Sequence, residues 1–139
     1  LDQLAGRAAL NIELKGPNTA APLASLLKGY LSNGTWKEED LLISSFDWNL
    51  LLETRDLLPE ISIGVLTEAY PLEAIPTAKE LSAVSINPYF KDLDAAIVTQ
   101  IQAAGFKVYT WTVNTPEDLK NVKKLGVDAV FTNFPDRSF

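Results

Sequence analysis

A carboxylate and an ammonium group lie two residues apart in the segment LNIELK, at Glu13 and Lys15. The apolar residues Leu10, Ile12 and Leu14 alternate with polar ones there, a period typical of a β-strand. Because strand side chains alternate between faces, Glu13 and Lys15 point to the same side. A carboxylate can bind a hard divalent cation such as Mg²⁺ or Ca²⁺, and an ammonium can hold a phosphate or stabilise developing negative charge. The pair therefore suggests a charged site for a phosphoester, with an exposed ion pair on an edge strand as the alternative.

The composition is that of a packed globular domain, since 47% of the 139 residues are hydrophobic and 22% are charged. The net charge of −6, without a run of Lys or Arg, argues against nucleic-acid binding and gives no reason to expect attraction to anionic membranes. No apolar run approaches the ~18 residues of a transmembrane helix. The chain has no cysteine, which excludes disulfides but leaves the compartment open. It also has no histidine, so the usual proton shuttle near neutral pH is missing.

Short apolar runs alternate with longer segments of helical period, and this order predicts βα units and a parallel sheet. The expected strands are 10–15, 41–46, 62–67, 83–87, 107–113 and 128–132, and the expected helices are 20–32, 48–57, 71–81, 93–104 and 116–125. Thr115 and Pro116 indicate the start of the last helix, and Gly126 indicates its end. Most strands begin apolar and end polar, which places the polar groups at one carboxyl-terminal rim, where barrel active sites lie.

Four segments in this order resemble the later part of glycerophosphodiester phosphodiesterases. They are LNIELKGP, LLISSFDWNLLLETRDLLPEISIGVLTE, AVSINPYF and AAGFKVYTWTVNTPEDLKNVKKLGVDAVFTNFPD, and together they extend over residues 10–136. The resemblance implies an α/β fold, a TIM-type (β/α) barrel of the phosphodiesterase kind. It would be present here as a partial barrel of about six strands and five helices. Residues 1–139 would then be a single domain, the C-terminal part of that barrel.

The resemblance also implies an activity, the metal-dependent hydrolysis of glycerophosphodiesters to glycerol 3-phosphate and an alcohol. Glu13 matches the metal-binding carboxylate of the family's N-I-E-x-K strand, and the cation would be Mg²⁺ or Ca²⁺. Lys15 matches the lysine near the substrate phosphate, which makes it the expected catalytic residue. Phe46 and Trp111 match aromatic residues that line the substrate pocket, although either could simply pack a barrel mouth. Ser44 and Ser45 are expected to form strand-end hydrogen bonds, because no histidine is present to activate a nucleophile.

Several family motifs are absent from this sequence. The family begins with His-Arg-Gly and Glu-x-Asp strands and a later His-Asp, which supply the acid, the base and further metal ligands. The chain supplies one of three metal carboxylates, and Thr132-Asn133 replaces the frequent Thr-Asp near the end. We therefore expect the first two or three barrel strands to come from the same or another polypeptide. A degenerate relative that only binds is the remaining possibility.

The sequence thus predicts an enzyme of which this chain supplies part of the active site, and which is inactive as these 139 residues alone. The alternative is a non-catalytic barrel fragment that acts as a binding or interaction module. The expected partners are a glycerophosphodiester and the missing strands, with no nucleic acid and no transmembrane segment. The alcohol group of the substrate, the choice between Mg²⁺ and Ca²⁺, the oligomeric state and the localisation stay open.

Overall fold

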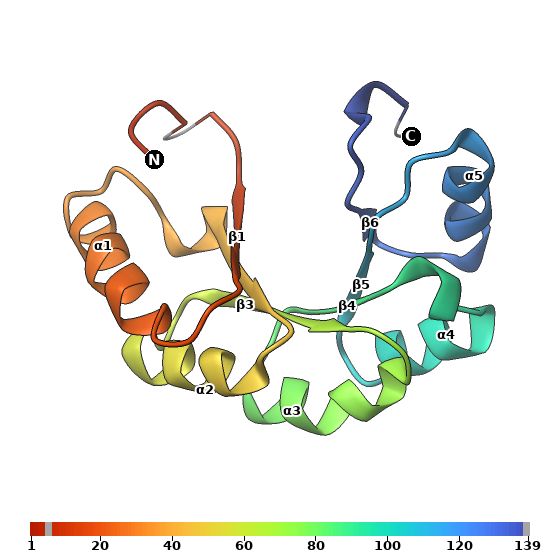
Figure 1. Cartoon of the computed structure of the whole chain (residues 1–139), viewed down its shortest axis with the longest axis horizontal. Helices are drawn as coiled ribbons and strands as arrows, with labels where there is room; N and C mark the ends of the chain where they lie inside the picture. The colour runs from red at the N-terminus through yellow and green to blue at the C-terminus, as the bar shows by residue number, and fades with distance from the viewer. Residues whose placement is uncertain (5–6, 138–139) are drawn as a thin grey trace. The chain divides into compact units, whose positions relative to one another are not determined.

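The computed structural model describes residues 1–4 and 7–137 (Figure 1). Within these ranges, six β-strands alternate with five α-helices. The chain forms two compact units, Leu1–Val65 and Leu66–Phe139, and each is described by itself. None of the helices in the described ranges is long and apolar enough to cross a membrane.

The first unit is built from parallel strands and the helices that connect them. Its elements in chain order are β1 (Leu10–Leu14), α1 (Ala20–Ser32), a 3₁₀ helix (Glu38–Asp40), β2 (Leu41–Ser45), α2 (Trp48–Leu57) and the start of β3 (Ser62–Thr67). β2 pairs with β1 on one side and with β3 on the other, and both pairings are parallel. Figure 1 shows α1 and α2 on the outer side of these strands.

The core of the first unit lies between the strands and these two helices. Ile43 and Ile63, which are register partners in β2 and β3, are fully buried, as are Leu27 of α1 and Leu51 of α2. Alternation then turns the polar residues of β1 to the opposite face. The apolar face of the sheet thus holds the first unit together, and the other face is left for polar side chains.

The second unit repeats the same arrangement. After a 3₁₀ turn (Pro71–Ala74), its elements are α3 (Ile75–Glu80), β4 (Ser85–Pro88), a 3₁₀ helix (Phe90–Asp92), α4 (Ala95–Ala103), β5 (Lys107–Thr110), α5 (Pro116–Leu125), β6 (Ala129–Val130) and a final 3₁₀ helix (Pro135–Arg137). β5 pairs in parallel with β4 and with β6. The register partners Ile86 and Val108 are fully buried, together with Ile101 of α4. A second cluster, of Val113, Leu119 and Val122, packs α5 against the chain beyond β5.

Local signals decide where the helices begin and end. At the start of α5 the Thr115 side chain accepts a hydrogen bond from the Asp118 N–H (3.1 Å), and at its end Gly126 adopts φ 83°, as the sequence predicts. The predicted start of α4 at residue 93 is wrong, because the Asp94 side chain caps the helix by accepting from the Ile97 N–H (2.8 Å). An N-cap residue lies outside the helix, so α4 starts at Ala95, two residues later than predicted.

Two further predictions of element length are corrected. The segment 71–81 is not one α-helix but a 3₁₀ turn followed by α3. Pro76 has no N–H to donate to the carbonyl four residues earlier, which explains the break. The last two strands are shorter than predicted, with β5 ending at Thr110 and β6 spanning two residues.

Within the described ranges, the observed elements confirm the predicted α/β class, with six strands and five α-helices. In the described residues, β1 pairs only with β2, and β6 pairs only with β5. Each of these two strands therefore has one edge without a strand partner in this part of the chain.

Candidate active site

The carboxyl end of β1 carries the predicted charged pair. Glu13 is the register partner of Ser44 in β2, and the Lys15 Nζ lies 3.6 Å from Glu13 Oε1. The Lys15 side chain is 77% exposed and the Glu13 side chain 31% exposed. The pair is thus a loose ion pair at the end of a strand, where water or a ligand can reach both groups.

Buried serines of β2 fix the end of β1. The Ser45 hydroxyl donates to the Leu14 carbonyl (2.7 Å) and accepts from the Asp47 N–H (3.0 Å), so it ties β1 to the turn after β2. The Ser44 hydroxyl donates to the Asn11 side chain (3.0 Å). Both serines are fully buried and bonded, which confirms the strand-end hydrogen bonding expected for them.

An open pocket of about 450 Å³ lies beside the charged pair. It is lined by Glu13, Leu14, Lys15, Phe46 and Asp47. Phe46 follows β2 directly and is 45% exposed, so its ring lines the pocket and is not part of the core. Three of the four predicted site residues therefore share one pocket in the first unit.

The sequence reasoning missed Asp47 as a pocket residue. It is the N-cap of α2, and its Oδ1 accepts from the Asn49 N–H (3.0 Å). Its position directly before the predicted helix 48–57 was the available signal, because aspartate is a preferred N-cap residue. The cap brings a second carboxylate to the pocket of Glu13.

The residues of this chain do not make a complete metal site. Among the described residues, no group of three or more acidic, histidine or cysteine side chains could hold a metal ion. Mg²⁺ and Ca²⁺ need about six or more oxygen ligands, several of which can be waters. Glu13 and Asp47 can thus supply at most two ligands from this pocket, and further protein ligands would have to come from elsewhere.

The fourth predicted residue, Trp111, belongs to the second unit and follows β5. Its indole N–H donates to the Asn87 carbonyl (2.8 Å). Its ring lies 5.1 Å from the Tyr89 ring, between centroids, at 38°. Trp111 is half-buried, and a hydrogen bond and a tilted ring contact hold it at the carboxyl end of its strand.

The loop after Trp111 is bonded to the last segment of the described chain. Asn114 Oδ1 accepts from the Asn133 N–H (2.9 Å) and from the Thr132 hydroxyl (3.3 Å). The Asn114 carbonyl accepts from Arg137 (3.3 Å). The altered Thr132-Asn133 pair therefore links the chain after β6 to the loop after β5, through the Thr132 hydroxyl and the Asn133 main-chain N–H.

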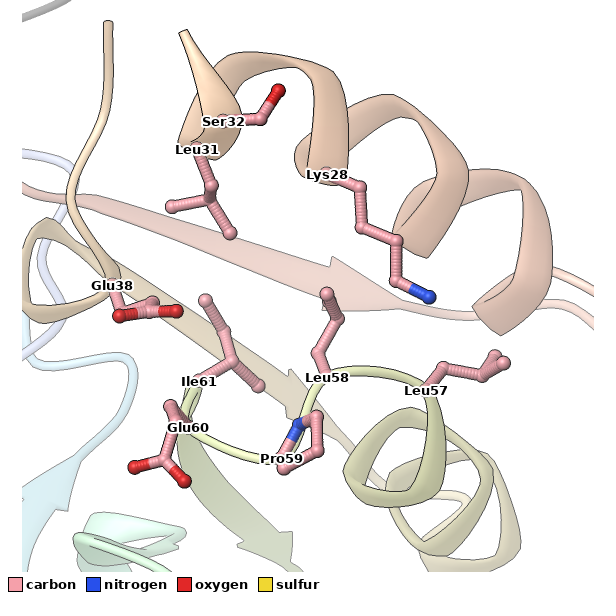
Figure 2. Close-up of a pocket in the computed structure, with 9 residues that line it drawn as sticks. All are labelled: Lys28, Leu31, Ser32, Glu38, Leu57, Leu58, Pro59, Glu60 and Ile61. Atoms are coloured by element: carbon pink, nitrogen blue, oxygen red, sulfur yellow. The ribbon is translucent and has the colours of Figure 1, made fainter. Parts of the chain in front are cut away.

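A second hollow of about 450 Å³ in the first unit lies away from these residues (Figure 2). It is formed by the carboxyl ends of α1 and α2 and by the turn before β3. Arg55 fixes this turn by donating to the carbonyls of Pro59 (2.6 Å) and Ile61 (2.9 Å), and burial lowers the pKa of its guanidinium. None of the predicted site residues lines it, so the candidate site stays at the carboxyl ends of the strands.

Comparison with known proteins gives a consistent result. A model of the glycerophosphoryl diester phosphodiesterase family matches residues 13–137. A glycerophosphodiester phosphodiesterase of Bacillus subtilis is 31% identical to the chain, and the match covers 98% of the chain and 50% of that relative. The chain spans about half the length of the curated relatives it matches.

Solved structures show the same fold. A Silicibacter pomeroyi protein assigned to the glycerophosphoryl diester phosphodiesterases superposes with a TM-score of 0.83 at 26% identity, over 98% of this chain and 52% of its own. An Oleispira antarctica phosphodiesterase, solved with the product sn-glycerol-3-phosphate, has a TM-score of 0.80 at 28% identity, over 93% of this chain and 53% of its own. The predicted fold class, a partial barrel of the phosphodiesterase kind, is confirmed.

Proposed function

The chain belongs to the glycerophosphoryl diester phosphodiesterase family, and on this basis we propose that it forms part of an enzyme that hydrolyses glycerophosphodiesters to glycerol 3-phosphate and an alcohol. The matched region 13–137 includes all four predicted site residues. The observation that carries the proposal is the open pocket that joins a carboxylate, an ammonium and an aromatic ring at the carboxyl end of β1.

The proposal assigns Lys15 to the substrate phosphate. Its ammonium is exposed and has one carboxylate partner, Glu13, at 3.6 Å. An ammonium in this position attracts the phosphate and stabilises the negative charge that grows on its oxygens during P–O cleavage. Phe46 and Trp111 are assigned to the organic part of the substrate, because aromatic faces pack against carbon atoms.

We also propose that Glu13 is one ligand of a divalent cation, Mg²⁺ or Ca²⁺. Such a cation would polarise a phosphoryl oxygen as a Lewis acid. The exposed carboxylate of Glu13 suits a hard cation, Asp47 lines the same pocket, and the remaining protein ligands would come from outside this chain.

The rest of the barrel is assigned to strands of the same or another polypeptide. The proposal is supported by the share of the relatives that the chain covers, about half, and by the unpaired edges of β1 and β6 in the described residues. An edge strand offers free N–H and C=O groups to a further strand. These strands would also supply the acid and base, since the chain has no histidine.

The test compares the chain alone with the chain joined to the remaining part of the barrel. The purified 139 residues should release no glycerol 3-phosphate from glycerophosphocholine, because a positioned acid or base contributes ~10²–10⁴-fold in rate. The completed barrel should release it, and chelation should stop the reaction. Metal-dependent release by the chain alone would overturn the assignment of acid and base to other strands.

A non-catalytic binding module is the second candidate. It is favoured by the lack of a three-ligand metal group among the described residues. The reading frame before Leu1 separates the two functions, because an enzyme requires His-Arg-Gly and Glu-x-Asp strands there or on a partner. A completed barrel that binds glycerol 3-phosphate but hydrolyses no diester would establish the binding module.

A further inference from the structure

Two aromatic residues of the second unit, Tyr89 and Trp111, lie just beyond the carboxyl ends of β4 and β5. Asn87 and Tyr89 are two residues apart in extended backbone, so their side chains lie on the same face. Tyr89 forms a parallel bridge with Trp111, and its N–H donates to the Thr67 carbonyl (3.2 Å). Three side chains from two neighbouring strand ends are thus brought together: Asn87, Tyr89 and Trp111.

The two rings form a rigid unit, here called the aromatic wall and consisting of Tyr89 and Trp111. Their centroids are 5.1 Å apart, a separation typical of favourable ring pairs. The indole N–H of Trp111 is fixed on the Asn87 carbonyl at 2.8 Å. The wall is therefore preorganised, which lowers the entropic cost of binding a ligand.

The Asn87 side chain at the base of the wall has unused hydrogen-bonding capacity. It is fully buried, and neither Nδ2 nor Oδ1 has a partner in the described part of the chain. Buried polar groups almost always have a hydrogen-bond partner, so the unpaired Nδ2 and Oδ1 of Asn87 indicate a partner from outside the described residues. An amide offers two donors and an acceptor, a combination that matches a hydroxyl group, which also donates and accepts.

We propose that Asn87 and Tyr89 determine specificity for the glycerol end of the diester, with Trp111 as the third side of the subsite. The aromatic wall would pack against the carbon atoms of the glycerol. The Asn87 amide would bond a glycerol hydroxyl, and the Tyr89 hydroxyl would serve as a second polar contact. Because Asn87 has no exposed surface, the side chains that cover it have to shift for the hydroxyl to reach the amide. This inference rests on the proposed function.

The test uses the completed barrel and two substrates. One is the phosphodiester of glycerol and ethanol, and the other is that of propanol and ethanol, which lacks both glycerol hydroxyls. Asn87→Leu should reduce the preference for the glycerol diester, as a ratio of kcat/KM, by about tenfold or more, because a site built for a hydroxyl rejects an analogue without it. Tyr89→Phe should reduce the ratio by about threefold. Asn121→Leu on α5 and Tyr30→Phe on α1 are matched controls that should leave the ratio unchanged.

Direct binding gives a second measurement. Glycerol 3-phosphate should raise the Tm of the parent protein and of Asn121→Leu but not of Asn87→Leu, and it should change the tryptophan emission of the parent but not of Trp111→Phe. If the parent hydrolyses neither diester, the proposed function fails. If it hydrolyses the glycerol diester but Asn87→Leu keeps the preference, the inference alone is overturned. An Asn87→Leu protein with a lowered Tm and an unchanged preference would show a purely structural amide.

Discussion

A lysine–carboxylate ion pair of the first unit and one of the second unit have the same chemistry and different surroundings. In the first unit Glu13 and Lys15 are 3.6 Å apart at the carboxyl end of β1, and Lys15 is 77% exposed. In the second unit Lys107 and Asp128 are 3.0 Å apart at the amino ends of β5 and β6. Asp128 also accepts from the Val108 N–H (2.9 Å) and from Gln102 (3.1 Å).

The difference separates a charge that holds the fold from a charge that is left for a ligand. Partial burial raises the pKa of Asp128, but the hydrogen bonds from Val108, Gln102 and Lys107 and the charge of Lys107 lower it by more, so it lies below its ordinary value. The hydrogen bond to Asp128 and the negative charge of Asp128 raise the pKa of Lys107. Glu13 has no partner other than Lys15 among the described residues. The Asp128 carboxylate already accepts several hydrogen bonds, so it has little capacity to bind a new ligand. The Glu13 carboxylate, at the carboxyl end of its strand, still has free acceptor positions for a ligand.

The largest effect is expected on the rate. Lys15→Ala in the completed barrel should lower kcat by roughly 10²–10³, by analogy with the loss of one donor to a developing charge. Added metal should not restore this rate, because the lost group is the ammonium. Lys107→Ala is the matched control and should leave kcat within about twofold. Equal losses in the two variants would show that the position of the pair does not decide its role.

A smaller effect is expected on metal affinity. Glu13→Gln replaces a charged oxygen by a neutral one, which hard cations bind less well. The metal concentration for half-maximal activity should rise on the order of 10–100-fold. Loss of a group that only orients a metal ligand already weakens metal binding by about this factor, so loss of the ligand's own charge should weaken it at least as much. Raising the metal concentration should recover part of the rate, and Asp128→Asn should leave the titration unchanged. A Glu13→Gln enzyme with parental metal dependence would leave Glu13 as a structural residue.

The smallest effect is expected on the stability of the fold, and it should be confined to the Lys107–Asp128 pair. The pKa of Asp128 is lowered in the folded state, so its charge stabilises the fold above the unfolded value of about 3.9 and this contribution is lost as the pH falls through the folded value. Asp128→Asn should therefore lower Tm at pH 7, and the difference from the parent should close below about pH 3.9.

Melting curves of Asp128→Asn, Glu13→Gln and the parent between pH 3 and 7 would measure this. Glu13→Gln should change the stability by less than about 0.5 kcal/mol, as is usual for surface positions. A pH-independent Tm difference for Asp128→Asn would assign the effect to lost packing instead of lost charge.

The elements that the sequence predicts best are those with local signals at both ends. The helices α1, α2 and α5 have the predicted bounds, and so does β3. In α5, Thr115 and Gly126 act within a few residues of the helix ends, so tertiary contacts are not needed to place them. The predicted starts of α3 and α4 are wrong because Pro76 interrupts the α-helical hydrogen bonding after residue 71 and because Asp94 caps α4.

The candidate site was predictable where alternation or a motif specifies it. The shared face of Glu13 and Lys15 follows from the two-residue period of β1, and Phe46 follows from the family motif that it matches. The roles of Asn87 and Asp128 were not predictable in this way. Asp128 meets Val108 and Gln102 across 20 and 26 residues, and such pairings depend on strand register.

The sequence by itself determined the alternation of strands and helices, the rim that carries the polar groups, and the family, because periodicity, capping and motif order are local properties of the chain. Only the tertiary structure decided which polar groups are satisfied. The Trp111 indole bonds the Asn87 carbonyl while the Asn87 amide stays unpaired among the described residues. Burial and hydrogen bonding depend on which segments lie next to each other in space, and they separate the charges that stabilise the fold from the groups that remain available to a substrate.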